Sequence, residues 1–475
     1  MNDAATVSFP SESSTSAART VMADALRKAD PVGSRAIENE TNWRRHYLEH
    51  FRRAVEAGIG DPAAAHAIAA DGLRSAHALM RFGEVGLDEA ISGTALTQAF
   101  HTRTIRGAAA PETELSIPYR GERLAGADLV AQLERWVTDG IITRSAADAV
   151  QTVQDNPDWL RLEGDTVVVL GAGAEMGPYR ALLRWGATCV ALDLPRDDVQ
   201  GRVRDLATEL AGTAHVPARI VTNGADDSGA DLLTELPGIA HWLGGIEGRL
   251  VLGNYCYADG GTHVRLSMAA DALAEHLVRE RPDTALAFLA TPTDTFVVPG
   301  EDVQLSNDAY GRRGASRLLR GPLRVASGGR LLQRHYAPGA DPGVCDSLVP
   351  QQGPNYAFAK RLQRWRATTS RAEGTPVSLN VAPATRTRSV LKNKALAAAY
   401  AGAHRFGVEI FDPATSNTLM AALLVHDLRV AAPARPEPWQ DEAASAAHGG
   451  LWTAAYDPRS ALGLAAVLGI GALRG

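Results

Sequence analysis

Three glycines and one carboxylate in this chain have the spacing of a nucleotide-binding turn. The segment 166–177 reads Thr-Val-Val-Val-Leu-Gly-Ala-Gly-Ala-Glu-Met-Gly, so Gly171, Gly173 and Gly177 directly follow a short β-branched run. Glycines let the backbone turn sharply and approach a ligand closely. Asp193 lies roughly 20 residues after the first glycine, where a carboxylate can accept hydrogen bonds from a ribose diol. We therefore expect this segment to bind a nucleotide, with its phosphates against free amides at the start of the next helix.

A second pair of reactive side chains lies farther along the chain. Tyr356 and Lys360 are four residues apart in a helical pattern, so they share one helix face and can reach a common ligand. The ammonium group can lower the pKa of the phenol, which would make Tyr356 a usable proton donor or acceptor near neutral pH. Such a pair also occurs by chance on helix surfaces, so its meaning depends on the surrounding elements.

The elements that must position these residues alternate between strands and helices from Gly164 onward. Strands are predicted at 166–170, 188–192, 218–222, 249–257, 284–290 and 377–381. Helices are predicted at 230–243, 264–279, 356–373, 395–406 and 417–424. This alternation is typical of a parallel sheet with helices on both faces. We therefore predict an α/β fold: a doubly wound, parallel, Rossmann-type sheet with an N-terminal all-helical region and a C-terminal extension.

The same patterns divide the chain into regions. Residues 1–17 are Ser-rich, lack the features of a secretory signal and predict a disordered leader. Residues 18–160 have helical spacing throughout and predict a cap, a lid or an oligomerisation unit. Residues 161–430 are predicted to form the nucleotide-binding and catalytic domain, interrupted at 296–355 by an insertion rich in Gly, Pro and Arg. Residues 431–475 are expected to form a linker and a C-terminal tail.

Composition narrows the classes of partner. A net charge of -6 over 475 residues gives no reason to expect nucleic acid or an anionic membrane as partner. The three cysteines, Cys189, Cys256 and Cys345, are too widely spaced for a zinc pattern or a disulfide framework, and they suit a reducing cytosol. The apolar run 461–473 is too short to span a bilayer. We expect a cytoplasmic protein without a membrane partner, and we predict no metal site.

With these elements in order, the chain resembles the short-chain dehydrogenase/reductase superfamily over about residues 164–390. There, a glycine turn opens the sheet, a Tyr-x-x-x-Lys helix carries the catalytic pair, and an Asn-x-x-x-Pro-Gly segment with a nearby Thr closes over the nicotinamide. The corresponding segment here runs from Asn380 to Pro383 and is followed by Thr385-Arg-Thr387. The resemblance implies an NAD(P)-dependent oxidoreductase that acts on a small carbonyl or alcohol substrate.

The resemblance also implies catalytic roles for particular residues. Tyr356 would be the acid/base, and Lys360 would bind the nicotinamide ribose and tune the tyrosine. A serine is usual at the end of the fifth strand, where this chain has Thr291; its hydroxyl can make the same hydrogen bond to a carbonyl oxygen. Thr293 and Ser347 are alternatives for that position.

Cofactor-binding roles follow in the same way. The residues implied are Gly171, Gly173, Gly177, Asp193, Asp226 or its neighbour Asp227, Asn254, Thr385 and Thr387. The carboxylate of Asp193 favours NAD, because it would repel a 2′-phosphate, while the nearby Arg196 leaves NADP open.

Three departures from the superfamily pattern predict a divergent member. The glycines follow G-x-G-x-x-x-G rather than G-x-x-x-G-x-G. Asn254-Tyr-Cys replaces the usual Asn-Ala-Gly after the fourth strand, and Ala384 replaces the glycine after Pro383.

Two further features could contact a substrate. The insertion carries seven arginines and no acidic residue between Ala309 and Ala340, so Arg312 and Arg313 could hold an anionic substrate, or the loop could be solvated and paired with acids of a neighbouring subunit. His263 follows Asp259-Gly-Gly-Thr at the carboxyl end of a strand, where ligands bind in such sheets, although a structural role is equally compatible.

Two other functions stay open. A glycine turn followed by an acid also suits an S-adenosylmethionine-dependent methyltransferase, which would leave Tyr356 and Lys360 without a role. The third alternative is a non-catalytic scaffold that binds a nucleotide, or no ligand, and acts through its helical N-terminal region. A homo-oligomer is expected from the resemblance, since the helices around 264 and 356 commonly pair across subunits in that superfamily.

Overall fold

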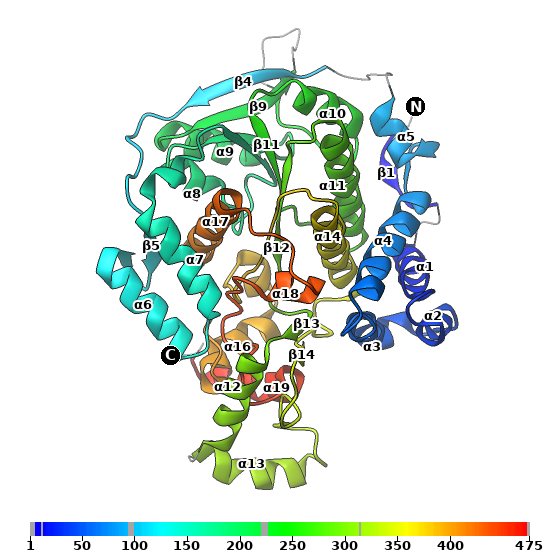
Figure 1. Cartoon of the computed structure of the whole chain (residues 1–475), viewed down its shortest axis with the longest axis vertical. Coiled ribbons are helices and arrows are strands. Elements are labelled where there is room, and N and C mark those ends of the chain that lie inside the picture. Colours follow the sequence, from blue (N-terminus) through cyan, green and yellow to red (C-terminus); the bar gives the residue numbers. More distant parts are fainter. Residues whose placement is uncertain (1–4, 11–12, 94–98, 220–226, 313–314, 473–475) are drawn as a thin grey trace.

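An eight-stranded, mostly parallel sheet forms the centre of the computed structural model, which describes residues 5–10, 13–93, 99–219, 227–312 and 315–472 (Figure 1). Its parallel strands lie in the order β9 (Thr213–Arg219), β8 (Thr188–Leu192), β7 (Asp165–Leu170), β11 (Arg249–Asn254), β12 (Ala285–Ala290) and β15 (Val377–Val381). The antiparallel strands β10 (Asp227–Ser228) and β4 (His101–Arg106) both pair with β9. The predicted mixed α/β architecture with a mainly parallel sheet is therefore confirmed.

Successive side chains of a central strand point to opposite faces of the sheet and enter two different hydrophobic cores. Val168 and Leu170 of β7 pack into one core, and Val167 and Val169 pack into the other. All four are fully buried, as expected for a strand covered on both faces. The strand predictions at 166–170, 188–192 and 377–381 are correct to within one residue.

One strand begins and ends earlier in the chain than predicted. The strand expected at 218–222 is β9, which begins at Thr213 and ends at Arg219, and residues 220–222 lie outside the described part. Pro217 lies within β9, opposite Thr102 of β4. Proline inside a strand pattern argues against a strand, which is why this element was misplaced.

Helices cover both faces of the sheet. One face carries α10 (Leu236–Gly244), α11 (Gly261–Glu280) and α14 (Pro354–Ala372). The opposite face carries α8 (Tyr179–Arg184), α9 (Asp197–Glu209) and α17 (Pro413–Val430). Among the described residues, no helix has the length and apolar character needed to cross a membrane.

The N-terminal region is not all-helical, which corrects the prediction for residues 18–160. Its helices are α1 (Ser14–Leu26), α2 (Pro31–Glu38), α3 (Trp43–Glu56), α4 (Pro62–Leu79), α5 (Leu87–Ser92), α6 (Gly126–Thr138) and α7 (Arg144–Asp155). Strands interrupt them: β2 (Arg81–Phe82), β3 (Val85–Gly86), β4, and the hairpin of β5 (Ser116–Tyr119) with β6 (Glu122–Ala125). β4 is largely exposed and becomes a strand because β9 supplies its hydrogen-bond partners, a long-range contact that local spacing does not report.

The expected leader also differs from the structure. Residues Val7–Ser8 form β1, which pairs with β2, and α1 already begins at Ser14. Val7 is fully buried, and its backbone N–H donates to the carbonyl of Leu233 at 2.8 Å. The described part of the first 17 residues is thus packed onto the protein.

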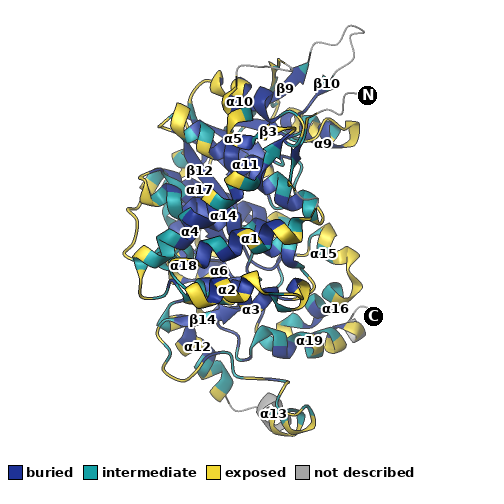
Figure 2. Cartoon of the chain, turned by 90° about the vertical axis from the view of Figure 1, so that its right-hand side faces the viewer, coloured by how far each residue is buried: buried dark blue, intermediate teal, exposed yellow. Residues whose placement is uncertain are grey.

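The N-terminal helices cover α11 and α14. α4 and α1 pack on α14, and α5 packs on α11, so the two long helices lie behind this layer (Figure 2). The contact is close: a Cβ on Gly72 of α4 would overlap the indole of Trp365 of α14. The helix faces on which we based the expectation of a homo-oligomer are therefore occupied by the chain's own N-terminal region.

The insertion and the C-terminal segment both contain regular secondary structure. The insertion contains β13 (Thr295–Val298) paired with β14 (Gly343–Asp346), together with α12 (Gly300–Gly311) and α13 (Ala315–Ala326). After β15 come α15 (Arg388–Lys392), α16 (Lys394–Gly402), η2 (Ala403–Phe406), α18 (Pro438–Ala443) and α19 (Pro458–Ala472). α19 packs along α16, so the predicted tail is part of the folded body.

Candidate functional site

A cavity of about 1060 Å³ lies at the carboxyl ends of the central parallel strands. Most of the residues singled out from the sequence line it: Gly171, Gly173, Asp193, Asn254, His263, Thr291, Tyr356, Lys360, Thr385 and Thr387. The set spans more than 200 positions of the chain, from Gly171 to Thr387. The parallel strand order brings these residues to one edge of the sheet.

Other predicted site residues lie elsewhere. Gly177 is in the turn before α8 but does not line the cavity. Arg312 is exposed beyond α12 and also does not line it. Asp226 and Arg313 lie outside the described residues, and Asp227, the alternative to Asp226, faces Arg219 at 3.3 Å.

The glycine turn is closed by the carboxylate of Asp193. The backbone N–H of Gly173 donates to Oδ2 of Asp193 at 2.8 Å, and the N–H of Leu194 donates to Oδ1 at 2.8 Å. Gly171 has φ +83°, and a Cβ there would lie 3.2 Å from the carbonyl oxygen of Tyr255. The turn therefore requires glycine at position 171, and it places a carboxylate beside backbone amides at the cavity.

The helix after this turn begins directly after a proline. α8 starts at Tyr179, and Pro178 precedes it as the N-cap residue. Because the residue before a proline disfavours the helical region, the chain cannot enter the helix at Gly177. Residues 171–178 are consequently turn, so residues of a turn rather than the first residues of a helix line the cavity near Gly173.

Asn254 lines the cavity and carries a buried, unpaired acceptor. It is the last residue of β11 and is 4% exposed. Within the described part of the chain, its Oδ1 has no hydrogen-bond partner. A buried amide oxygen without a partner is costly, so this position suits a ligand that donates a hydrogen bond.

Hydroxyl groups cluster where β12 ends. Oγ1 of Thr291 lies 2.9 Å from Oγ1 of Thr293, which accepts a hydrogen bond from Nε2 of Gln352 at 2.7 Å. Ser347 instead contacts the carbonyls of Pro292 and Asp294 at 2.7 and 3.0 Å and is fully buried. Its proton is engaged by the backbone, so Thr291 is the better placed of the three predicted hydroxyls.

Tyr356 and Lys360 lie at the start of α14 and face the cavity. Burial raises the pKa of Tyr356, and a hydrogen bond with Thr291 only partly opposes this. The lowering that we expected from Lys360 is therefore not found. Burial lowers the pKa of Lys360 to about 8, and its Nζ donates to the carbonyl of Leu289 at 3.1 Å and to Oε1 of Gln363 at 3.0 Å.

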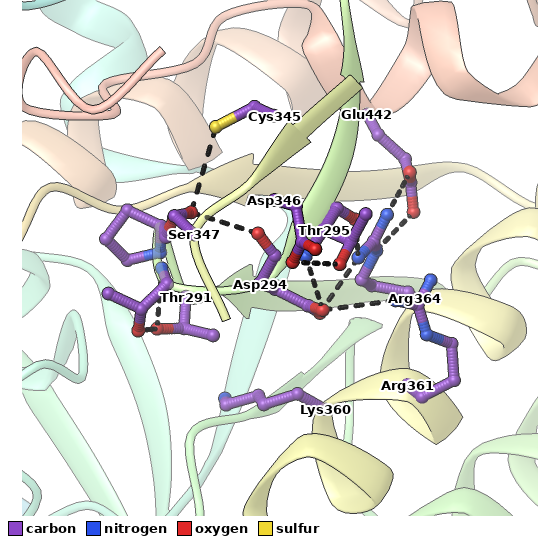
Figure 3. A network of polar contacts seen from close by, with 12 residues as sticks. Thr291, Asp294, Thr295, Cys345, Asp346, Ser347, Lys360, Arg361, Arg364 and Glu442 are labelled. Atoms are coloured by element: carbon purple, nitrogen blue, oxygen red, sulfur yellow. Dashed lines mark hydrogen bonds and ion pairs between the residues drawn. The ribbon is translucent and has the colours of Figure 1, made fainter. Parts of the chain in front are cut away.

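A buried ion-pair network holds α14 beneath this site (Figure 3). Asp294, 1% exposed, pairs with Arg361 at 3.1 Å and with Arg364 at 2.8 Å. Arg364 also binds Glu442 of α18 at 2.6 Å. Burial opposes the charge on Asp294, but the two guanidinium groups hold its carboxyl pKa below the ordinary value. These residues were not among the predicted site residues, although two arginines three positions apart on one predicted helix, Arg361 and Arg364, were a signal.

His263 stacks on Tyr356, with ring centroids 5.6 Å apart and an angle of 18° between the planes. Its Nδ1 accepts a hydrogen bond from the N–H of Ala258 at 3.3 Å. Burial, assisted by the charge of Lys360, lowers its pKa to about 3, so the ring is neutral and carries its proton on Nε2. In the described part of the chain this Nε2 has no partner, which leaves a buried donor beside the phenol.

The arrangement combines a proton-holding phenol, a lysine, a threonine hydroxyl and a neutral histidine beside a glycine turn. Such a set can bind a phosphorylated ligand and transfer a proton to or from an oxygen atom. Comparison with family models and with curated proteins finds no match to this chain.

Proposed function

We propose that this protein is an NAD(P)-dependent oxidoreductase acting on a carbonyl/alcohol pair, of the type that the short-chain dehydrogenase/reductase resemblance implies. The observation that carries the proposal is the convergence of the glycine turn, Asp193, Thr291, Tyr356 and Lys360 on one cavity. The parallel strand order β9-β8-β7-β11-β12-β15 supports it, since it corresponds to the order 3-2-1-4-5-6 of dinucleotide-binding Rossmann sheets.

The residues present fit a dinucleotide. Gly173 has no side chain to obstruct phosphates, and a Cβ there would approach Oδ2 of Asp193 to 3.2 Å. Asp193 would exchange its hydrogen bond to the turn for one from the adenosine ribose. The free Oδ1 of Asn254 would accept a hydrogen bond from the cofactor, and Thr385 and Thr387 line the cavity on its β15 side. Arg202 also lines the cavity, so NADP stays open beside NAD.

When bound, a nicotinamide cofactor supplies or accepts a hydride. In reduction, Tyr356 would donate its phenolic proton to the carbonyl oxygen of the substrate while the carbonyl carbon would receive the hydride, so the C=O π bond would be replaced by C–H and O–H bonds. The raised pKa of Tyr356 keeps that proton in place at neutral pH. Thr291 would hold the substrate oxygen, and solvent would return a proton to Tyr356 afterwards.

Titration of the full chain with NADH, NADPH and S-adenosylmethionine, followed by thermal unfolding, tests the proposal. Binding of either nicotinamide should raise Tm as the ligand concentration passes its Kd. Binding of the methyl donor alone would favour the methyltransferase alternative, and no shift with any of the three would favour the scaffold.

A matched pair of glycine variants sharpens this test. Gly173→Ala should weaken nicotinamide binding by about tenfold or more, because the new methyl group enters the phosphate-facing turn. Gly177→Ala should leave affinity nearly unchanged, since a Cβ there meets only ordinary contacts of 3.5 Å or more. Equal effects of the two substitutions would contradict the proposed phosphate site.

A further inference from the structure

The cavity continues beyond Tyr356 into a compartment with apolar walls. Its walls come from α16, η2, the segment before α19, and α19 itself, and they include Leu396, Phe406, Ile410, Leu451, Leu462 and Ala465. We call this part the apolar compartment. Tyr400 of α16 connects it to the catalytic side: burial raises the pKa of Tyr400 to about 12, and the neighbouring Tyr356 adds to the shift.

The charges around the cavity are unevenly distributed. The lining residues with a formal charge all precede Thr387 in the chain: Arg44, Glu175, Asp193, Arg202, Asp231, Asp259 and Lys360. Among the described lining residues that follow Thr387, none carries a formal charge. A charged group placed among these uncharged residues would lose hydration, and none of them would supply an opposite charge, which is unfavourable.

The arginines of the insertion do not supply that missing charge. Arg320 donates to the carbonyl of Tyr310 at 2.9 Å and lies 3.8 Å above the ring of the same residue. Arg334 donates to Oδ1 of Asn307 at 3.0 Å. Neither lines the cavity, and the exposed Arg312 does not line it either.

The walls of the apolar compartment are closely packed. A Cβ on Gly402 of α16 would overlap the carbonyl oxygen of Ala465, and a Cβ on Gly469 would overlap that of Ala398. On the outer side, Leu332 of the insertion packs with Tyr456 and Ala461. The insertion therefore supports this wall.

The cavity volume lies just above the range of pockets for one small molecule. A pocket for one small molecule has about 300–1,000 Å³. The cavity of about 1060 Å³ exceeds that range, and only its turn side offers the groups that a dinucleotide needs. The apolar compartment is then available to a second molecule.

We infer that the substrate is a neutral, predominantly hydrocarbon ketone or secondary alcohol whose apolar part lies in the apolar compartment. The inference rests on the proposed function for the reacting group, which would be held by Thr291 and Tyr356. It replaces the anionic substrate that the arginine-rich insertion suggested.

Ligand binding can be measured independently of the cofactor. The neutral fluorophore N-phenyl-1-naphthylamine would be bound to the full chain and displaced by 2-alkanones of four to twelve carbons. Affinity should rise up to about fourfold for each added methylene, the equivalent of about 0.8 kcal/mol. Affinity that does not grow with chain length, or tighter binding of fatty carboxylates than of ketones of equal length, would overturn the inference.

Two substitutions on α19 test whether the chain-length dependence of ketone affinity arises in the apolar compartment. Leu462→Glu places a charge in the apolar compartment and should abolish the dependence on chain length, whereas Leu468→Glu, at a position 54% exposed, should preserve it. If Leu462→Glu fails to fold, Leu396→Gln tests the adjoining wall formed by α16. An unchanged dependence in the folded compartment variant would also overturn the inference.

Titration of the same protein with NADH and NADPH distinguishes failure of the substrate inference from failure of the proposed function. Chain-length dependence together with NADH or NADPH binding supports both. Chain-length dependence without nicotinamide binding supports the apolar ligand class and overturns the proposed function alone. Nicotinamide binding without chain-length dependence overturns only the substrate inference.

Discussion

The stacked pair of Tyr356 and His263 determines which proton forms are present at the candidate site. Burial raises the pKa of the phenol and lowers that of the imidazole, so both groups are neutral near pH 7. A protonated tyrosine beside a threonine hydroxyl is prepared to donate to a substrate oxygen. Under the proposed function, these neutral forms favour proton donation to a substrate oxygen, as carbonyl reduction requires, over proton abstraction at neutral pH.

Removing the Tyr356 hydroxyl should stop the proposed reaction without preventing cofactor binding. Tyr356→Phe is expected to reduce kcat by about 10²–10⁴-fold, the usual contribution of a positioned acid. The Kd for NADH should stay within about twofold, because the ring and its stacking on His263 are retained. Tyr400→Phe, at a second tyrosine of the cavity, serves as the control and should keep most of the activity. Loss of cofactor binding in Tyr356→Phe would instead indicate a structural role.

Lys360 should make cofactor affinity depend on pH. Its pKa of about 8 means that its charge is present below pH 8 and is lost as the pH rises through that value. Affinity for NADH should then fall by about tenfold between pH 7 and pH 9, the equivalent of one charge-assisted hydrogen bond of about 1.5 kcal/mol. The Lys360→Arg variant keeps its positive charge between pH 7 and pH 9 and should remove this pH dependence of NADH affinity. Identical profiles in fluorescence titrations of the two proteins would contradict the role of Lys360.

At the scale of elements, a buried polar network joins α4, α11 and α14. Arg366 of α14 donates to Asp271 of α11 at 2.8 Å and to Glu275 at 2.6 Å, and His77 of α4 lies 2.6 Å from Asp271. His77, Asp271 and Glu275 could offer three ligand atoms to a metal. The guanidinium of Arg366 already binds both carboxylates, so the geometry is that of an ion-pair network.

His77 should make stability depend on pH with a definite sign. Burial opposes its charge, but hydrogen bonds with Asp271 and Asp88 raise its pKa from 6.5 to about 10. The native state then binds more protons than the unfolded state between these values. The contribution of His77 is therefore fully present below about pH 6.5 and is lost as the pH rises through about 10.

Urea unfolding of His77→Gln measures this contribution. The variant should lose about 2 kcal/mol of unfolding free energy at pH 6, as expected for a hydrogen bond between charged groups. The deficit should shrink as the pH approaches 10. His46→Gln, whose side chain is 38% exposed beside Glu40, is the control and should change stability by less than about 1 kcal/mol. A deficit that is constant with pH would contradict the raised pKa of His77.

At the scale of the whole molecule, the N-terminal region covers apolar surface of α11 and α14 that would otherwise be exposed to solvent. Trp365 of α14 is 5% exposed because Gly72 of α4 lies against it. Residues 13–92 also enclose the apolar sides of α11 and α14 within the larger core. We interpret this region as an internal cover for the two long helices.

Removal of the cover should make the protein associate with itself. A chain beginning at residue 99 keeps β4 and the whole sheet but exposes the apolar surface around Trp365. Large exposed apolar patches promote association. Sedimentation velocity should show a higher stoichiometry for the shortened chain than for the full chain. An unchanged stoichiometry with a native circular dichroism spectrum would contradict the covering role.

Local patterns in the sequence predicted the centre of the molecule well. The β-branched run at 166–170 and the strand at 377–381 are correct because a strand covered on both faces needs a continuous apolar stretch. The position of the functional candidates at strand ends was also predictable, since parallel strands bring their carboxyl ends to one edge. Ten of the predicted residues line one cavity for that reason.

Tertiary contacts decided the rest. Exposed residues of β4 form a strand only because β9 is adjacent, and the predicted tail becomes a cavity wall only because Gly402 and Gly469 let α19 approach α16. The expected lowering of the Tyr356 pKa was wrong, because a spacing of four residues shows which side chains share a helix face but not how deeply they are buried. The sequence alone therefore determined which groups gather at the sheet edge. Their protonation, and the apolar compartment beside them, follow from contacts between segments distant in the chain.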